Sequence, residues 1–174
     1  EAGDRVNILG WNRPAWTVFD APAMAVGAVT VEIYPTPSPD ECEYVLNHSG
    51  AKVLLVQNEE QWLKINAVRE SLTDLKTVVA MPNSEPIDDE WVMSWADFLA
   101  KADSVPAEAV DARLAAIDLD SPGTLIYTSG TTGRPKAVML SHRNLTWTAQ
   151  VAVDLLGVKP EDRTLSYLPL CHVA

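Results

Sequence analysis

Cysteine is scarce in this sequence, and its two cysteines stand far apart. Cys42 and Cys171 form no Cys-x-x-Cys pair, and no histidines follow them at the spacing of a zinc site. The sequence therefore offers neither a disulfide framework nor a structural metal pattern. We expect two reduced thiols and a cytoplasmic protein, because reducing compartments keep isolated cysteines free.

Long apolar runs and an excess of basic residues are also missing. No uninterrupted apolar stretch reaches membrane-spanning length, and the chain does not open on a basic-then-apolar targeting pattern. Thirteen Lys and Arg residues against 24 Asp and Glu residues give a net charge of −11, which repels nucleic-acid phosphates. We expect no transmembrane segment and no nucleic-acid partner, while peripheral membrane association and the oligomeric state stay open.

Apolar segments of strand length alternate with helical patterns through the first 81 residues. One helix has complete signals, with Ser38 as N-cap, Pro39 as its first residue, Glu41 completing a capping box and Gly50 at its end. Parallel strands need such crossovers, so the sequence predicts an α/β fold, a mainly parallel sheet flanked by helices. The expected strands are 5–9, 28–34, 51–56 and 76–81; the expected helices run from an N-cap at Asn12 through Met24, over 39–49 and over 59–72.

The pattern weakens after this unit. We read 82–122 as an acidic connector with a short helix over 94–102 and a partly helical stretch before Pro122, and 123–174 as a separate functional segment. A helix capped by Ser141 is expected to reach Gly157. Both ends look cut from something longer, so we expect residues 1–174 to be an incomplete domain.

The functional segment opens with a short strand, Thr124–Tyr127, and then a loop of unusual composition. Its glycines allow positive φ and close approach of an anion, its hydroxyls donate hydrogen bonds, and its lysine adds a full charge. These are the features of a phosphate-binding loop. The residues in question are Thr128, Ser129, Gly130, Thr131, Thr132, Gly133, Arg134, Pro135 and Lys136.

The loop does not fit the commoner glycine motifs. Arg134 and Pro135 separate Gly133 from Lys136, which excludes a Walker A loop, and Gly-x-Gly-x-x-Gly is absent. By composition alone, a hairpin loop without any ligand explains the residues at least as well. The order of the residues is what favours function.

Residues 127–142, read in order, resemble the signature of the adenylate-forming (AMP-binding) superfamily of acyl-CoA synthetases, luciferases and peptide-synthetase adenylation domains. Similarity extends to Gly3–Val6, Tyr34–Thr36 and Leu165–His172, so it covers nearly the whole chain. The tryptophan content and the Tyr167–Leu170 run are closest to long-chain fatty-acid-CoA ligases. The resemblance implies an N-terminal part of the large domain of an acyl-CoA synthetase, with the C-terminal domain absent.

The resemblance also implies substrates and roles. The intact enzyme would use ATP, Mg²⁺, a fatty acid and coenzyme A, and the chain alone would be inactive. Thr128, Ser129, Gly130, Thr131, Thr132, Gly133 and Lys136 would bind the nucleotide, Lys136 and His172 would be catalytic, and no protein metal ligands are expected.

Purely structural roles for these residues, and other functions for the protein, stay open. Lys136 could be a solvated lysine, His172 a core histidine, and His48 only the last turn of a helix. Ala137 departs from the family, where glycine is common, which leaves a non-catalytic nucleotide-binding module as one alternative. An adenylating enzyme for aryl or amino acids is another.

Overall fold

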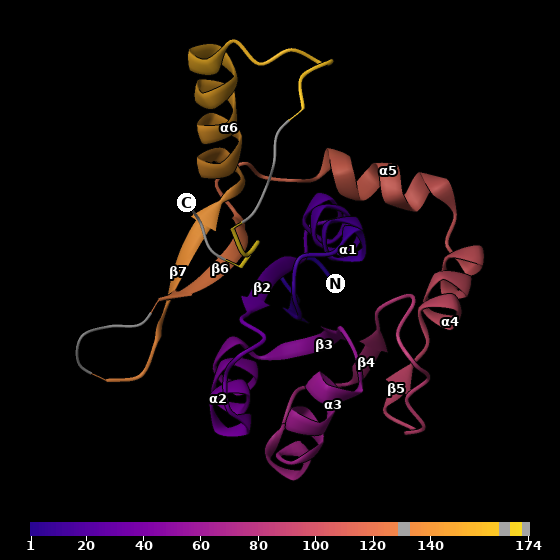
Figure 1. Cartoon of the computed structure of the whole chain (residues 1–174). Coiled ribbons are helices and arrows are strands. Elements are labelled where there is room, and N and C mark those ends of the chain that lie inside the picture. The colour runs from indigo at the N-terminus through magenta and orange to yellow at the C-terminus, as the bar shows by residue number, and fades with distance from the viewer. Residues whose placement is uncertain (129–132, 164–167, 172–174) are drawn as a thin grey trace.

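The computed structural model describes residues 1–128, 133–163 and 168–171. Within them lies one seven-stranded sheet of order β5-β4-β3-β1-β2-β6-β7 (Figure 1). Every neighbouring pair is parallel except β6 and β7, which are antiparallel. The strands are β1 (Arg5–Leu9), β2 (Val29–Ile33), β3 (Ala51–Val56), β4 (Thr77–Ala80), β5 (Val92–Met93), β6 (Pro122–Thr128) and β7 (Lys136–Ser141).

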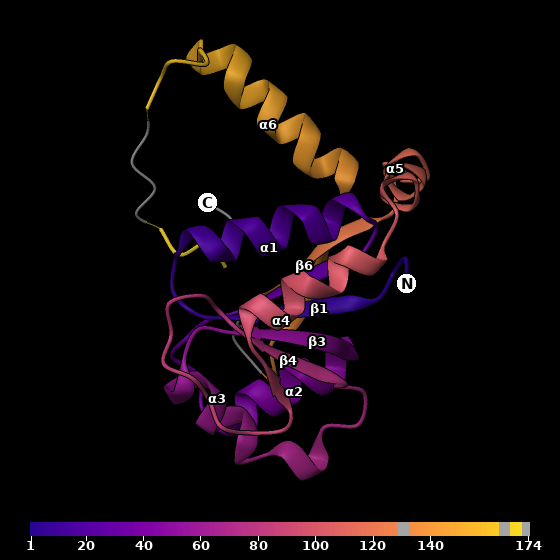
Figure 2. The same cartoon turned by 90° about the vertical axis from the view of Figure 1, so that its right-hand side faces the viewer.

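Helices cover both faces of the sheet, which confirms the predicted fold class. Figure 2 shows α1 and α4 on one side of the strands and α2 and α3 on the other. Ile8, on β1, packs with residues of α1, whereas its neighbour Leu9 packs with residues of α2 and α3. The helices are α1 (Pro14–Ala25), α2 (Pro39–Ser49), α3 (Glu59–Asn66), α4 (Trp95–Ala100), α5 (Ala107–Ala115) and α6 (His142–Leu156), with 3₁₀ turns η1 (Arg69–Ser71) and η2 (Lys101–Ser104).

The inner strands are buried on both faces, which explains why their sequences lack polar alternation. Every residue of β2 is buried, and so are four of the five residues of β1. The four strands expected in the first 81 residues are all present to within two residues at their ends. The helix expected over 59–72 is shorter, because α3 ends at Asn66 and only the turn η1 follows.

Helix α2 has the termini that its sequence predicts. The Ser38 hydroxyl accepts a hydrogen bond from the Glu41 amide, and the Glu41 carboxylate accepts one from the Ser38 amide. Gly50 ends the helix in the left-handed region, at φ 66°. Cys42, Val45 and Leu46 are buried in the core, so the helix is fixed at both ends and along one face.

We expect Gly50→Ala to lower the free energy of unfolding by about 2 kcal/mol, measured by urea denaturation. Alanine is strained at this φ, and its Cβ would also lie 2.6 Å from Nη2 of Arg5. Gly157→Ala is the matched control, because Gly157 ends α6 at φ 61° with nothing within 4 Å of the added carbon. Equal losses in the two variants would contradict a contribution from Arg5.

The start of α1 corrects one prediction. Arg13, not Asn12, is the N-cap residue, and no side chain caps this helix. The Nδ2 of Asn12 instead donates to the carbonyl of Leu168 at 2.6 Å, and its Oδ1 accepts from the amide of Leu170 at 2.7 Å. The prediction was wrong because the amide is used by a segment far away in the sequence.

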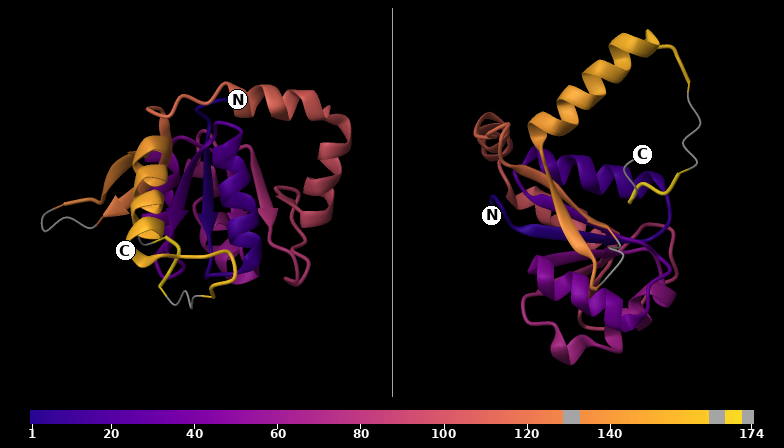
Figure 3. Two further views of the ribbon diagram at one scale, coloured as in Figure 1. Left: turned by 90° about the horizontal axis from the view of Figure 1, so that it is seen from above. Right: turned by 90° about the vertical axis from the view of Figure 1, so that its left-hand side faces the viewer.

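The hairpin β6–β7 and helix α6 lie together at one side of the body (Figure 3). Ser141 caps α6 and Gly157 ends it, as predicted. Three of its large apolar side chains are largely exposed, with Trp147 67%, Leu155 80% and Leu156 77% accessible. In the part of the chain that the structure describes, no helix is both long and apolar enough to cross a membrane.

Candidate functional site

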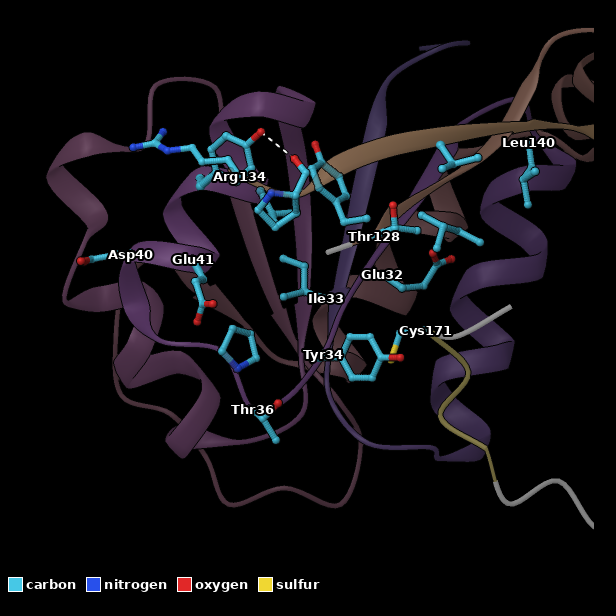
Figure 4. Close-up of a pocket in the computed structure, with 17 residues that line it drawn as sticks. Glu32, Ile33, Tyr34, Thr36, Asp40, Glu41, Thr128, Arg134, Leu140 and Cys171 are labelled. Carbon is cyan, nitrogen blue, oxygen red and sulfur yellow. Dashed lines mark hydrogen bonds between the residues drawn. The ribbon is translucent and has the colours of Figure 1, made fainter. Parts of the chain in front are cut away.

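A pocket of about 880 Å³ opens where β2 and β6 end, against α2 (Figure 4). Ligands of open α/β sheets bind beyond the carboxyl ends of the strands, so the position is the expected one. Tyr34 follows β2, Thr128 ends β6, and Arg134 and Pro135 come from the far arm of the loop. Cys171 forms part of another wall of the pocket. It follows Leu168 and Leu170, whose backbone is hydrogen-bonded to Asn12.

The antiparallel pairing of β6 and β7 brings the two arms of the predicted phosphate loop together. Thr128 and Lys136 are register partners across this hairpin, and both are exposed. Gly133 lies between them at φ 108°, with nothing within 4 Å of an added Cβ, so glycine is needed there for conformation and not for space. A hydroxyl, a cation and a permissive backbone therefore meet at the edge of the pocket.

The predicted site residues have three different outcomes. Thr128 lines the pocket, whereas Lys136, its partner at the start of β7, and Gly133, three residues earlier, do not line it. Ser129, Gly130, Thr131, Thr132 and His172 lie outside the described residues, so their assignment stays a prediction. The hydroxyl and the lysine of the two flanking arms are the part of the predicted set that the structure brings together.

Ala137, the departure from the family pattern, sits in an ordinary strand. It pairs with Tyr127 across the hairpin. Among the described residues Asn83 is the one non-glycine residue with positive φ, so Ala137 has a conformation that any residue adopts. Its methyl group therefore costs no backbone strain.

An aromatic cluster that the sequence did not predict lies against the two arms of the hairpin. The Tyr44 hydroxyl donates to the carbonyl of Pro135 at 2.9 Å, and the Tyr127 hydroxyl lies 2.7 Å from Nδ1 of His48. Burial, with a contribution from Tyr44, raises the pKa of Tyr127 to about 12. The available signal was the four-residue spacing of Tyr44 and His48, which places both on one face of α2.

A second polar cluster lies at the other end of the pocket. Glu32 is 8% exposed, and its carboxyl group lies 3.3 Å from the Thr30 hydroxyl and 3.1 Å from that of Thr124. Burial and then the neighbouring charge of Asp20 raise the pKa of Glu32 to about 7. Burial also raises the pKa of Asp20 and, to about 11, that of Cys171.

Within residues 1–128, 133–163 and 168–171, no group of three or more His, Cys, Asp or Glu residues is arranged to hold a metal ion. Among the described residues, Cys42 and Cys171 are free and buried.

Comparison with known proteins agrees with the geometry. A family described as AMP-binding enzyme matches residues 1–174. A long-chain-fatty-acid–CoA ligase, ACSBG2 of Xenopus laevis, is 35% identical over 173 residues, which are 97% of this chain and 23% of that protein. The chain spans about a quarter of the length of the curated relatives it matches.

Solved structures show the same fold. Acetoacetyl-CoA synthetase of Streptomyces lividans superposes with a TM-score of 0.79 at 22% identity, covering 99% of this chain and 27% of that one. ATP-bound MatB of Rhodopseudomonas palustris gives a TM-score of 0.71 at 20% identity, covering 99% of this chain and 31% of that one. At these identities the likeness concerns the fold alone.

Proposed function

The chain belongs to the family of AMP-binding enzymes, and from this premise we propose that the whole protein joins a carboxylate to AMP and then to coenzyme A. The observation that carries the proposal is the pairing of Thr128 with Lys136 across the β6–β7 hairpin, at the edge of the pocket. The matching family is described as AMP-binding enzyme, which supports ATP as the nucleotide that supplies the AMP.

The proposed first step is formation of an acyl-adenylate. An oxygen of the substrate carboxylate attacks the α-phosphorus of ATP. The bond between the α-phosphorus and the oxygen that bridges to the β-phosphate breaks, and pyrophosphate leaves with that oxygen. Negative charge builds on the leaving group. Lys136 offsets that charge, and hydroxyls and amides of residues 128–133 hold the β- and γ-phosphates, so these residues act by position and electrostatics.

Further parts of the proposal concern residues and ions that the structure does not describe. Mg²⁺ would supply additional charge neutralisation on the phosphates, held mainly by their oxygens. His172 would orient the carboxylate between the acyl pocket and the nucleotide. In the second step the thiol of coenzyme A attacks the acyl carbonyl carbon, and AMP leaves.

We propose a fatty acid, of long chain, as the carboxylate. The support is that four curated relatives, each 35–37% identical to this chain, are named long-chain-fatty-acid–CoA ligases. An enzyme for aryl or amino acids is the competing substrate class. The case for a non-catalytic module rested on Ala137, and it is weakened because Ala137 occupies an unstrained strand position.

The cellular and domain assignments are also proposals. Free, buried Cys42 and Cys171 are the state expected in a reducing compartment, so we propose a cytoplasmic enzyme. We propose that 1–81, 82–122 and 123–174 are the alternating strand/helix unit, the connector and the phosphate-loop segment of one incomplete AMP-binding domain, whose single sheet takes strands from all three. Peripheral membrane association remains compatible with this proposal.

Carboxylate-dependent ATP–pyrophosphate exchange by the whole protein tests the function. We expect exchange that rises from short- to long-chain fatty acids, and no exchange by residues 1–174 alone. A peak with aryl or amino acids would replace the substrate class. No exchange with any carboxylate, from protein shown to be folded, would overturn the enzymatic proposal.

A further inference from the structure

Helix α2 contacts the far arm of the loop through Tyr44. The Tyr44 hydroxyl donates to the carbonyl of Pro135 at 2.9 Å (the dashed line in Figure 4). The guanidinium carbon of Arg134 lies 5.0 Å from the centre of the same ring, within the range of a cation–π contact. One side chain thus holds both residues that precede Lys136.

The same helix contacts the near arm through His48. Nδ1 of His48 lies 2.7 Å from the hydroxyl of Tyr127, the residue before Thr128. The Tyr127 ring meets those of His48 and Tyr44 edge to face, with centroids 5.7 and 6.3 Å apart. The phenol of Tyr127 is protonated at neutral pH, so its hydroxyl can donate to Nδ1 in the His48 tautomer that leaves Nδ1 without a proton.

The helix itself is well anchored, which makes it a suitable support. Its capping box and the left-handed Gly50 fix its ends, and its inner face lies in the core. Tyr44 and His48 are spaced four residues apart, so both side chains leave the same face toward the hairpin.

We propose that Tyr44 and His48 are positioning residues that brace both arms of the phosphate loop from α2. The brace holds Thr128 and Lys136 side by side before any nucleotide binds. Nucleotide binding then loses less conformational entropy in ordering these two residues. The link to nucleotide rests on the proposed function, whereas the brace itself rests only on the contacts given above.

Hydrogen exchange of the whole protein without nucleotide tests the brace. In Tyr44→Phe the ring remains and only the hydroxyl is lost, so amides of residues 133–138 should exchange about three- to tenfold faster. Ser104→Ala is the matched control, because it also deletes a hydroxyl that donates to a backbone carbonyl, that of Lys101, on η2 and not on α2 or the hairpin. Equal exchange in residues 133–138 of both variants would overturn the brace.

The His48 side needs a pair of variants. His48→Leu removes the partner of the Tyr127 hydroxyl and should speed exchange around Tyr127 by a similar factor. His48→Asn places a polar atom near the position of Nδ1 and should restore most of the protection. Equal rates in the leucine and asparagine variants would overturn a specific role for this hydrogen bond.

Steady-state kinetics test the link to ATP. A brace predicts that Tyr44→Phe raises KM for ATP about three- to tenfold and leaves kcat and KM for the carboxylate within twofold. A merely structural defect would instead lower the active fraction, so kcat would fall at constant KM, and this result would overturn the link. A wild-type protein that does not use ATP would defeat the proposed function, while the exchange measurement would still decide the brace.

Discussion

Replacing Lys136 with alanine in the whole protein is expected to slow acyl-adenylate formation by about a hundredfold. Lys136 begins β7 opposite Thr128, at the edge of the pocket, where it can meet the charge that develops on departing pyrophosphate. Its side chain is exposed, so its removal should leave the free energy of unfolding within about 0.5 kcal/mol. Single-turnover formation of the adenylate measures the rate, and urea denaturation checks the fold.

Two further variants sharpen this prediction. Lys101→Ala removes an exposed lysine on η2, distant from the loop in sequence, and should leave the rate unchanged. Lys136→Arg keeps the positive charge but carries it on a planar guanidinium group, so it should recover part of the rate. A normal rate in Lys136→Ala would remove Lys136 from the mechanism and leave the hydroxyls and amides as the proposed phosphate contacts.

Glu32→Gln is expected to stabilise the chain above neutral pH. The folded pKa of Glu32 is raised to about 7 by burial and by Asp20, whereas its ordinary value is 4.5. The folded state therefore keeps a proton that the unfolded state has lost, and stability falls as pH rises from about 4.5 to about 7. Above that window the ionised side chain costs about 3 kcal/mol, which the neutral amide avoids.

Urea denaturation between pH 5 and pH 8.5 measures the effect. The glutamine variant should gain about 2–3 kcal/mol over the wild type at pH 8.5, and the difference should shrink toward zero near pH 5. Glu85→Gln, at an exposed loop position, is the control and should change stability little at either pH. A constant difference across this range would show that ionisation of Glu32 does not cause the effect.

Local signals made much of the sheet predictable. Strand ends at Leu9 and Val56 follow from apolar runs bounded by Gly10 and Gln57, and α2 follows from its cap residues alone. Such signals act over a few residues, so they can be read without knowing the fold. The predicted roles of the loop hydroxyl and lysine came instead from the resemblance of residues 127–142 to a family motif, because composition alone explains a loop without ligand equally well.

Long-range contacts were not predictable by these means. Strand β5 has only two residues, and its pairing with β4 depends on how the connector folds back. Asn12 has the composition of a helix cap, but its amide is used by Leu168 and Leu170. Tyr44 likewise looks like an ordinary helical residue until the hairpin places Pro135 beside it. In each case the partner lies on an element whose position no local pattern specifies.

The hydrogen bonds of Asn12 also bear on how the chain folds. They join residues 156 and 158 positions apart, and closing such a span costs more chain entropy than any neighbouring strand pair does. We therefore expect these bonds to form late, after the sheet has already shortened the effective distance. Because they hold the segment that carries Cys171, the wall that this residue gives the pocket should be completed among the last steps of folding.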